Sequence, residues 1–300
     1  NFHGSDGKGY KMLADYVIFL DSMNPQVAAR LAIPLTRWRS HTINRQNLMI
    51  KQLQRIINIE KVSSDVFEIV DKGLVANWEK KMGKRIVVIN PNSTEDVTVE
   101  MDKAFNPFRA LTDTSIVSIT NPKGPPGIEC QEHADRVAIQ VIDLIRENEA
   151  SADAFVIACF SAPGIFSASE ITKKPIFGIA ESSILTALLC GNNYGIIAIL
   201  EGSIQRHIRY IRSLGLEARL AGDIAIGIGV TGLSQETETF DRLKQVGARL
   251  RDEKGADVLI LGCAGMARYR IPLEDYLGIR IIDPAQAAVS DAITTLQLYK

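Results

Sequence analysis

A short stretch of this sequence occurs twice in closely similar form. Residues 152–159 read ADAFVIAC and residues 256–263 read ADVLILGC, so each copy has an Ala-Asp start, an apolar run and a cysteine six positions after the aspartate. A short apolar run bounded by turn signals is typical of a strand buried on both faces. The repetition therefore predicts two similar folding units, each with a cysteine, Cys159 or Cys263, just past a strand.

Strand and helix patterns alternate around both copies. From residue 85 onward, short β-branched runs alternate with helical patterns, which predicts parallel sheets covered by helices. The predicted strands are 86–89, 115–119, 155–158, 176–179, 195–199, 225–230, 258–261 and 280–282, and the predicted helices include 132–146, 184–190, 204–214 and 235–253. We expect two pseudo-symmetric α/β lobes with the active site between them, because ligands of such sheets bind at the carboxyl ends of the strands.

The beginning of the chain has a different character. Apolar residues recur there every three to four positions, which indicates amphipathic helices. Residues 1–84 carry 13 Lys and Arg against 8 Asp and Glu, whereas the remaining chain carries 21 against 27. The sequence predicts an all-α appendage over 1–78, a linker over 79–84 and an α/β domain over 85–300. Met82 begins a stretch that reads like an ordinary protein start, which suggests a gene fusion.

Composition excludes several classes of protein. No apolar run is long enough to span a membrane, and the N-terminus has no secretory signal pattern, so we expect a cytoplasmic protein without membrane contact. The modest positive charge of the helical segment comes without basic runs or interleaved aromatic residues, so we expect no nucleic-acid partner.

The cysteines and histidines form no recognisable metal or disulfide pattern. The four cysteines include no CxxC pair, so the sequence predicts neither a disulfide framework nor a metal site. Cys130 and Cys190 are predicted to be buried, since a lone cysteine usually is. His133 and His207 fall in helical stretches among charged residues and are predicted to face solvent.

A glycine pattern at 227–232, GIGVTG, matches the dinucleotide-binding motif GxGxxG. A nucleotide site of that kind also needs an acidic residue at the end of the next strand. Here that strand ends at Leu261 and leads to Cys263, so we expect no nucleotide cofactor.

Two lobes that face each other would present one thiol to each side of a bound molecule. One thiolate would remove a proton from a carbon and the other thiol would deliver a proton to the opposite face, which inverts the centre without metal or organic cofactor. The small-residue turns 160–164 and 264–266 follow the cysteines and enter helices. Their N–H groups favour a thiolate.

Residues 85–300 resemble the Asp/Glu/hydantoin racemase superfamily, specifically its hydantoin and allantoin racemase branch. The motifs are INPNST at 89–94, GPPGIE at 124–129, ACFSAPG at 158–164, GIAESS at 178–183 and LGCAGM at 261–266. The resemblance implies that Cys159 and Cys263 are the acid/base pair of a cofactor-independent racemase that inverts C5 of a 5-substituted hydantoin. The substrate-binding residues it implies are Asn90, Phe160, Glu181, Ser182, Ala264 and Gly265. Ala162 departs from that branch, which often has aspartate there, so the substrate's identity stays open.

The helical segment contains HGSDGKGYKMLADYV at 3–17, DSMNPQVAARLAIPLTRW at 21–38 and SSDVFEIVDKGL at 63–74. With these motifs, residues 1–75 resemble the C-terminal helical segment of aminopeptidase N. The chain has no HExxH motif and hence no peptidase site. Other functions stay open. One is an aspartate/glutamate-type racemase, or a related decarboxylase or isomerase; another is a non-catalytic helical interaction module fused to a degenerate α/β domain. The expected partner is a small molecule, with a homo-oligomer as an open alternative.

Overall fold

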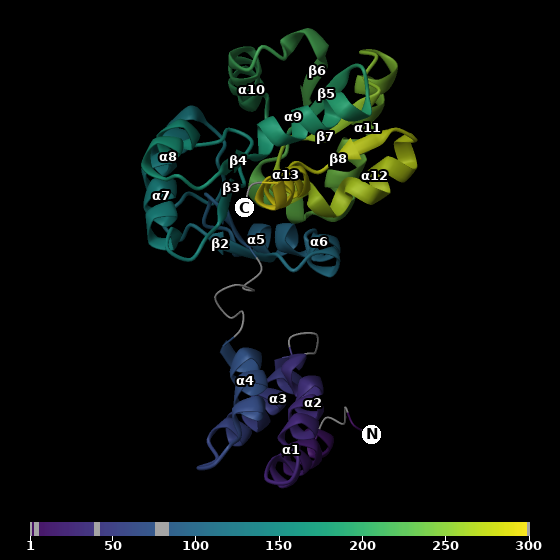
Figure 1. Ribbon diagram of the computed structural model, residues 1–300. Helices are drawn as coiled ribbons and strands as arrows, with labels where there is room; N and C mark the ends of the chain where they lie inside the picture. The colour runs from purple at the N-terminus through teal and green to yellow at the C-terminus, as the bar shows by residue number, and fades with distance from the viewer. Residues whose placement is uncertain (1, 3–5, 39–42, 76–83, 299–300) are drawn as a thin grey trace. The chain divides into compact units, whose positions relative to one another are not determined.

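The computed structural model describes residues 2, 6–38, 43–75 and 84–298 (Figure 1). The chain divides into two compact units, 1–82 and 83–300, which are described separately. The predicted linker lies outside the described residues except for Lys84. No helix in the described part of the chain is long and apolar enough to cross a bilayer.

The first unit is all-helical, as predicted. Its helices are α1 (Lys8–Asp21), α2 (Pro25–Thr36), α3 (Ile43–Ile57) and α4 (Ser64–Val75). Their apolar faces share one core that includes Tyr10, Leu35 and Leu53. Asp21, at the end of α1, accepts a hydrogen bond from the N–H of Ser63, which caps α4.

The second unit contains two parallel four-stranded sheets. The strands are β1 (Arg85–Asn90), β2 (Ser115–Thr120), β3 (Ala154–Ile157), β4 (Ile176–Gly178), β5 (Tyr194–Ala198), β6 (Leu220–Ala225), β7 (Val258–Leu261) and β8 (Arg280–Ile282). The order is β2-β1-β3-β4 in one sheet and β6-β5-β7-β8 in the other. The two orders are equivalent, so the predicted pair of pseudo-symmetric α/β lobes is confirmed.

Helices cover both sheets. They are α5 (Glu95–Lys103), α6 (Asn106–Leu111), α7 (Gln131–Asn148), α8 (Ile165–Ile171), α9 (Ile179–Cys190), α10 (Glu201–Ser213), α11 (Glu236–Asp252), α12 (Arg270–Leu277) and α13 (Pro284–Leu298), with short 3-10 helices η2 (Glu217–Arg219), η3 (Val230–Ser234) and η4 (Ala264–Tyr269). The central strands β1, β3, β5 and β7 are buried almost throughout, which explains their apolar sequences.

The last helix of each lobe packs on the other lobe. Helix α13 follows β8, yet Ala288 and Val289 share a core with Val88 of β1. Helix α9 follows β4, yet Ile184 shares a core with Ile260 of β7. Figure 1 shows α9 and α13 between the two sheets, where they also contact each other. This exchange holds the two lobes together.

One predicted strand is displaced. The strand expected at 225–230 instead spans Leu220–Ala225, and η3 begins at Val230. The polar Asp223 interrupts the apolar pattern of the true strand, and Gly227, with φ of 77°, ends the extended backbone.

Three side chains lie in a different environment from the predicted one. His207, expected to face solvent, is buried, with its Nδ1 2.8 Å from a carboxylate oxygen of Asp223. The acidic partner inside the fold compensates for burying this ring. Cys130 and Cys190, expected to be buried, are exposed because they lie at the start of α7 and the end of α9.

Candidate active site

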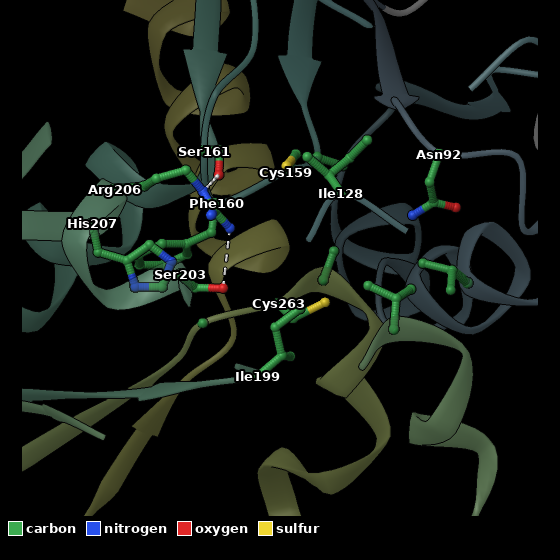
Figure 2. A pocket seen from close by; sticks show the side chains of 15 residues that line it. Asn92, Ile128, Cys159, Phe160, Ser161, Ile199, Ser203, Arg206, His207 and Cys263 are labelled. Atoms are coloured by element: carbon green, nitrogen blue, oxygen red, sulfur yellow. Dashed lines mark hydrogen bonds between the residues drawn. The ribbon is translucent and has the colours of Figure 1, made fainter. Parts of the chain in front are cut away.

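Cys159 and Cys263 lie two residues beyond the ends of β3 and β7. Both line one cavity between the lobes. Figure 2 shows the two cysteines on opposite sides of it. The equivalent positions of β3 and β7 in the two sheets explain this placement, because each strand delivers its cysteine to the edge that faces the other lobe.

The cavity is small and mostly apolar. Its volume is about 30 Å³, which is room for about two water molecules. The apolar lining residues are Val97, Ile128, Ala158, Phe160, Ile199, Val230 and Ala264. A small organic ring needs more room than this.

The surroundings of Cys159 contain donors and a positive charge. Burial raises the pKa of its thiol, whereas the N–H and hydroxyl of Ser161 and the charge of Arg206 oppose this rise. Because these groups favour the charged form, Cys159 has partners suited to a thiolate.

The surroundings of Cys263 contain negative charge. Burial raises the pKa of its thiol to about 12, and the N–H of Gly265 opposes that rise. Negative charges at Cys159, Asp283 and Glu129 contribute to the same rise. These surroundings favour the protonated form of Cys263, and a charge on Cys159 favours it further.

The structure brings some of the predicted binding residues to this cavity. Phe160 and Ala264 line it, and the N–H of Gly265 faces the thiol of Cys263. Ser161 and Gly265 are equivalent donors, since each follows its cysteine by two residues.

Other predicted binding residues lie outside the lining. The amide of Asn90 is buried and donates to Asn92 Oδ1 and Thr98 Oγ1, both at 3.0 Å. Glu181, in the first turn of α9, accepts a hydrogen bond from the hydroxyl of Tyr210 at 3.3 Å. Ser182 is buried and hydrogen-bonds Asp291.

Four polar residues that were not predicted line the cavity: Asn92, Ser203, Arg206 and His207. The last three lie on α10 after β5, where the first turns of a helix face the carboxyl edge of the sheet. The sequence could have indicated these residues as site candidates, because it predicts a strand at 195–199 followed by a helix at 204–214.

One group of residues has metal-ligand chemistry. The ligand atoms of Cys130, Glu132 and His133 lie within 4.8 Å of one another at the start of α7. The positive end of the helix and Arg136, which pairs with Glu132, oppose a cation there. The cavity between the lobes does not include these side chains.

Comparison with known proteins identifies the second unit. The family model described as Asp/Glu/Hydantoin racemase matches residues 86–292. The chain belongs to this family. A hydantoin racemase from Pseudomonas sp. (strain NS671) is 34% identical over 218 residues, which covers 72% of this chain and 87% of that protein. The structure of an allantoin racemase from Klebsiella pneumoniae has 29% identity and a TM-score of 0.68, with 72% of this chain and 89% of that one covered.

These relatives indicate that this member of the Asp/Glu/hydantoin racemase family is a racemase, as the sequence motifs predicted.

The first unit has separate relatives. A model of a domain of unknown function with ARM repeats matches residues 1–75. Aminopeptidase N from Haemophilus influenzae is 45% identical over 73 residues, which is 24% of this chain and 8% of that protein.

Proposed function

We propose that this chain is a cofactor-independent racemase that inverts C5 of a 5-substituted hydantoin by proton transfer between Cys159 and Cys263. The observation that carries the proposal is that both thiols line one cavity between equivalent strand ends. Acid/base catalysis of this kind needs both groups within reach of one carbon.

The proposed reaction exchanges one proton for another. The Cys159 thiolate takes the proton from C5 of one enantiomer, and the electron pair of the C–H bond moves into the adjacent carbonyl to form an enolate. The Cys263 thiol then gives its proton to the opposite face of C5, which leaves Cys159 as a thiol and Cys263 as a thiolate. The second enantiomer follows the same path in reverse. The N–H groups of Ser161 and Gly265 stabilise whichever sulfur is charged.

The charge of the lining favours a ring over a free amino acid. Arg206 is the one charged side chain among the described residues that line the cavity, and no carboxylate lines it. A free aspartate or glutamate would bring an ammonium group without an acidic partner, which is costly in a buried site. A hydantoin is a neutral ring with amide groups and has no such requirement.

Hydrogen exchange at C5 tests the mechanism directly. Each enantiomer of a hydantoin, with allantoin included, is incubated with the enzyme in heavy water, and deuterium at C5 and optical rotation are followed. We expect both enantiomers to exchange and racemise. Absence of enzyme-dependent exchange with every hydantoin tried would refute the proposed substrate class, and racemisation of free aspartate or glutamate instead would support the alternative.

Single cysteine variants test the roles. Cys159→Ser and Cys263→Ser should each reduce racemisation by about 10²–10⁴-fold, the usual contribution of a general acid or base. Each should keep exchange from only one enantiomer, and the two variants should retain opposite ones. Cys190→Ser is the matched control, because Cys190 is exposed at the end of α9. Retained racemisation in both active-site variants would contradict the two-thiol mechanism.

A further inference from the structure

The two halves of the cavity are built from equivalent elements but differ in chemistry. Helices α5 and α10 follow the equivalent strands β1 and β5. Val97 of α5 approaches the cysteine of the other lobe, because a Cβ placed on Gly265 would lie 3.8 Å from Val97 and 3.7 Å from Cys263 Sγ. Arg206 of α10 lies in the cavity with Cys159, again the cysteine of the other lobe.

The donors that follow the cysteines differ in the same way. Ser161 and Gly265 both offer an N–H, but only Ser161 adds a hydroxyl. The half-site of Cys159 therefore contains a hydroxyl and a guanidinium, whereas Gly265 and Val97 in the half-site of Cys263 offer no side-chain donor. A hydroxyl and a cation stabilise a thiolate, whereas a glycine and a valine side chain add no such donor.

Arg206 is held in place by contacts in both lobes. Its Nε donates to Ser161 Oγ at 3.4 Å, and Nη2 donates to the carbonyl of Glu129 at 3.1 Å, both in the first lobe. Within its own helix, Nη1 donates to the carbonyl of Gly202 at 2.8 Å. Figure 2 shows the guanidinium beside Ser161 on the Cys159 side of the cavity. The hydroxyl of Ser161 hydrogen-bonds Cys159 in turn, so a chain of donors runs from Arg206 to the sulfur.

We propose that Arg206 is a positioning residue that, through Ser161, makes Cys159 the first of the two thiols to ionise and leaves Cys263 as the proton-bearing partner. This inference rests on the proposed two-thiol function and deepens it, because it makes two topologically equivalent cysteines unequal before substrate arrives. The resting enzyme then begins catalysis with the enantiomer whose C5 proton faces Cys159.

The other charges around the two sulfurs agree with this assignment. Asp283 and Glu129 act on Cys263, and both oppose a second negative charge there. His207 also lines the cavity, but its ring is paired with Asp223. Arg206 is thus the one cation that acts on Cys159 among the described residues.

Alkylation by iodoacetamide tests the assignment without substrate. The full chain is treated over a range of pH, and peptide mass spectrometry gives the rate at each cysteine. For each cysteine, the pH at which the rate reaches half its maximum reports ionisation independently of access. We expect Cys159 to react at lower pH than Cys263. Arg206→Gln should slow Cys159 about tenfold near pH 8, the effect of a one-unit rise in its pKa, and Arg206→Lys should restore most of the rate.

Arg209→Gln is the matched control, since Arg209 lies on the same helix but is exposed and bonds Gln131. It should leave both rates unchanged. Circular dichroism and an unchanged Cys263 rate establish that Arg206→Gln is folded. If that variant does not fold, Ser161→Ala interrupts the same chain of donors and should slow Cys159 likewise.

The outcomes separate the two proposals. Faster reaction at Cys263, or a Cys159 rate that is unchanged in both Arg206→Gln and Ser161→Ala, overturns the role of Arg206 even if hydantoins are racemised. If no hydantoin is racemised but Cys159 ionises first and depends on Arg206, the proposed function fails and the charge assignment stands.

Discussion

At the scale of single residues, the turn after Cys159 contains backbone strain. Ala162 is buried with φ of 42°, in the left-handed region, and its N–H donates to the carbonyl of Cys159 at 2.9 Å. A residue with a Cβ loses roughly 1–2 kcal/mol in that conformation. The strained turn leads into α8 and sets the direction of Ser161, the donor to Cys159.

Replacing Ala162 should therefore relieve the strain. We expect Ala162→Gly to raise the free energy of unfolding by about 0.5–1 kcal/mol, because glycine adopts a positive φ freely and its extra unfolded-state entropy offsets only part of the gain. Urea denaturation measures the change. Ala168→Gly, inside α8 where the backbone is helical, should have the opposite sign. Destabilisation by both substitutions would show that the turn at Ala162 is not strained.

The sequence predicted the cysteines better than the residues around them. A repeated pattern placed Cys159 and Cys263 at equivalent strand ends, and the structure brings them to one cavity. Asn90 was predicted to bind substrate, but Asn92 is the asparagine that lines the cavity. Asn90 donates to Thr98 of α5, whereas Asn92 lines the cavity, and no local pattern encodes that difference.

At the scale of elements, the glycine-rich stretch after β6 has the GxGxxG pattern of a nucleotide-binding loop but packs against the other lobe. The segment that matches GxGxxG forms a loop and η3, and it receives the side chain of Glu129 from the other lobe. The N–H of Val230 donates to Glu129 Oε1 at 2.9 Å. A Cβ on Gly229 would lie 2.4 Å from the same oxygen. A side chain at residue 229 would force this carboxylate to move, so packing between the lobes accounts for the second glycine of the motif.

A methyl group on residue 229 should push Glu129 away from the N–H of Val230. We expect Gly229→Ala to lower the free energy of unfolding by about 0.5–1.5 kcal/mol, because Glu129 must move and its half-buried hydrogen bond with Val230 is lost. Racemisation should also fall, since Ile128 beside Glu129 lines the cavity. Gly202→Ala is the control, because no atom lies within 4 Å of a Cβ added there. Thermal unfolding and polarimetry measure both effects, and an unaffected Gly229→Ala would contradict the close approach.

Element types were predictable where apolar runs were continuous. The strand at 258–261 matches its predicted bounds, as does the strand at 280–282. The strand before Gly227 was displaced because Asp223 is polar yet buried against His207, a pairing that only the tertiary structure creates. The exchange of α9 and α13 was not predictable for a similar reason: an apolar helix face does not specify which sheet it covers.

At the scale of the whole molecule, the chain joins two units with different relatives. The racemase family match begins at residue 86, and the ARM-repeat match ends at residue 75. Each unit has its own hydrophobic core in the described residues. We propose that the units fold independently, with the division at the predicted linker.

A shortened chain tests this division. Residues 82–300 expressed alone should fold and should racemise the same substrate with a kcat/KM comparable to that of the full chain, because every described residue that lines the cavity belongs to this part. Circular dichroism and polarimetry are the measurements. Aggregation of the shortened chain, with activity only in the full chain, would mean that the helical unit is needed for folding of the racemase unit.

The crossed positions of α9 and α13 have a consequence for how such a molecule is assembled. A lobe produced by itself would lack the helix that shields one face of its sheet, and its own terminal helix would have nothing to cover. Two separate lobes could satisfy both needs only by trading helices, as subunits do in domain-swapped dimers. In this protein a single polypeptide makes the same trade internally, so the cavity between the lobes forms only when both halves are complete.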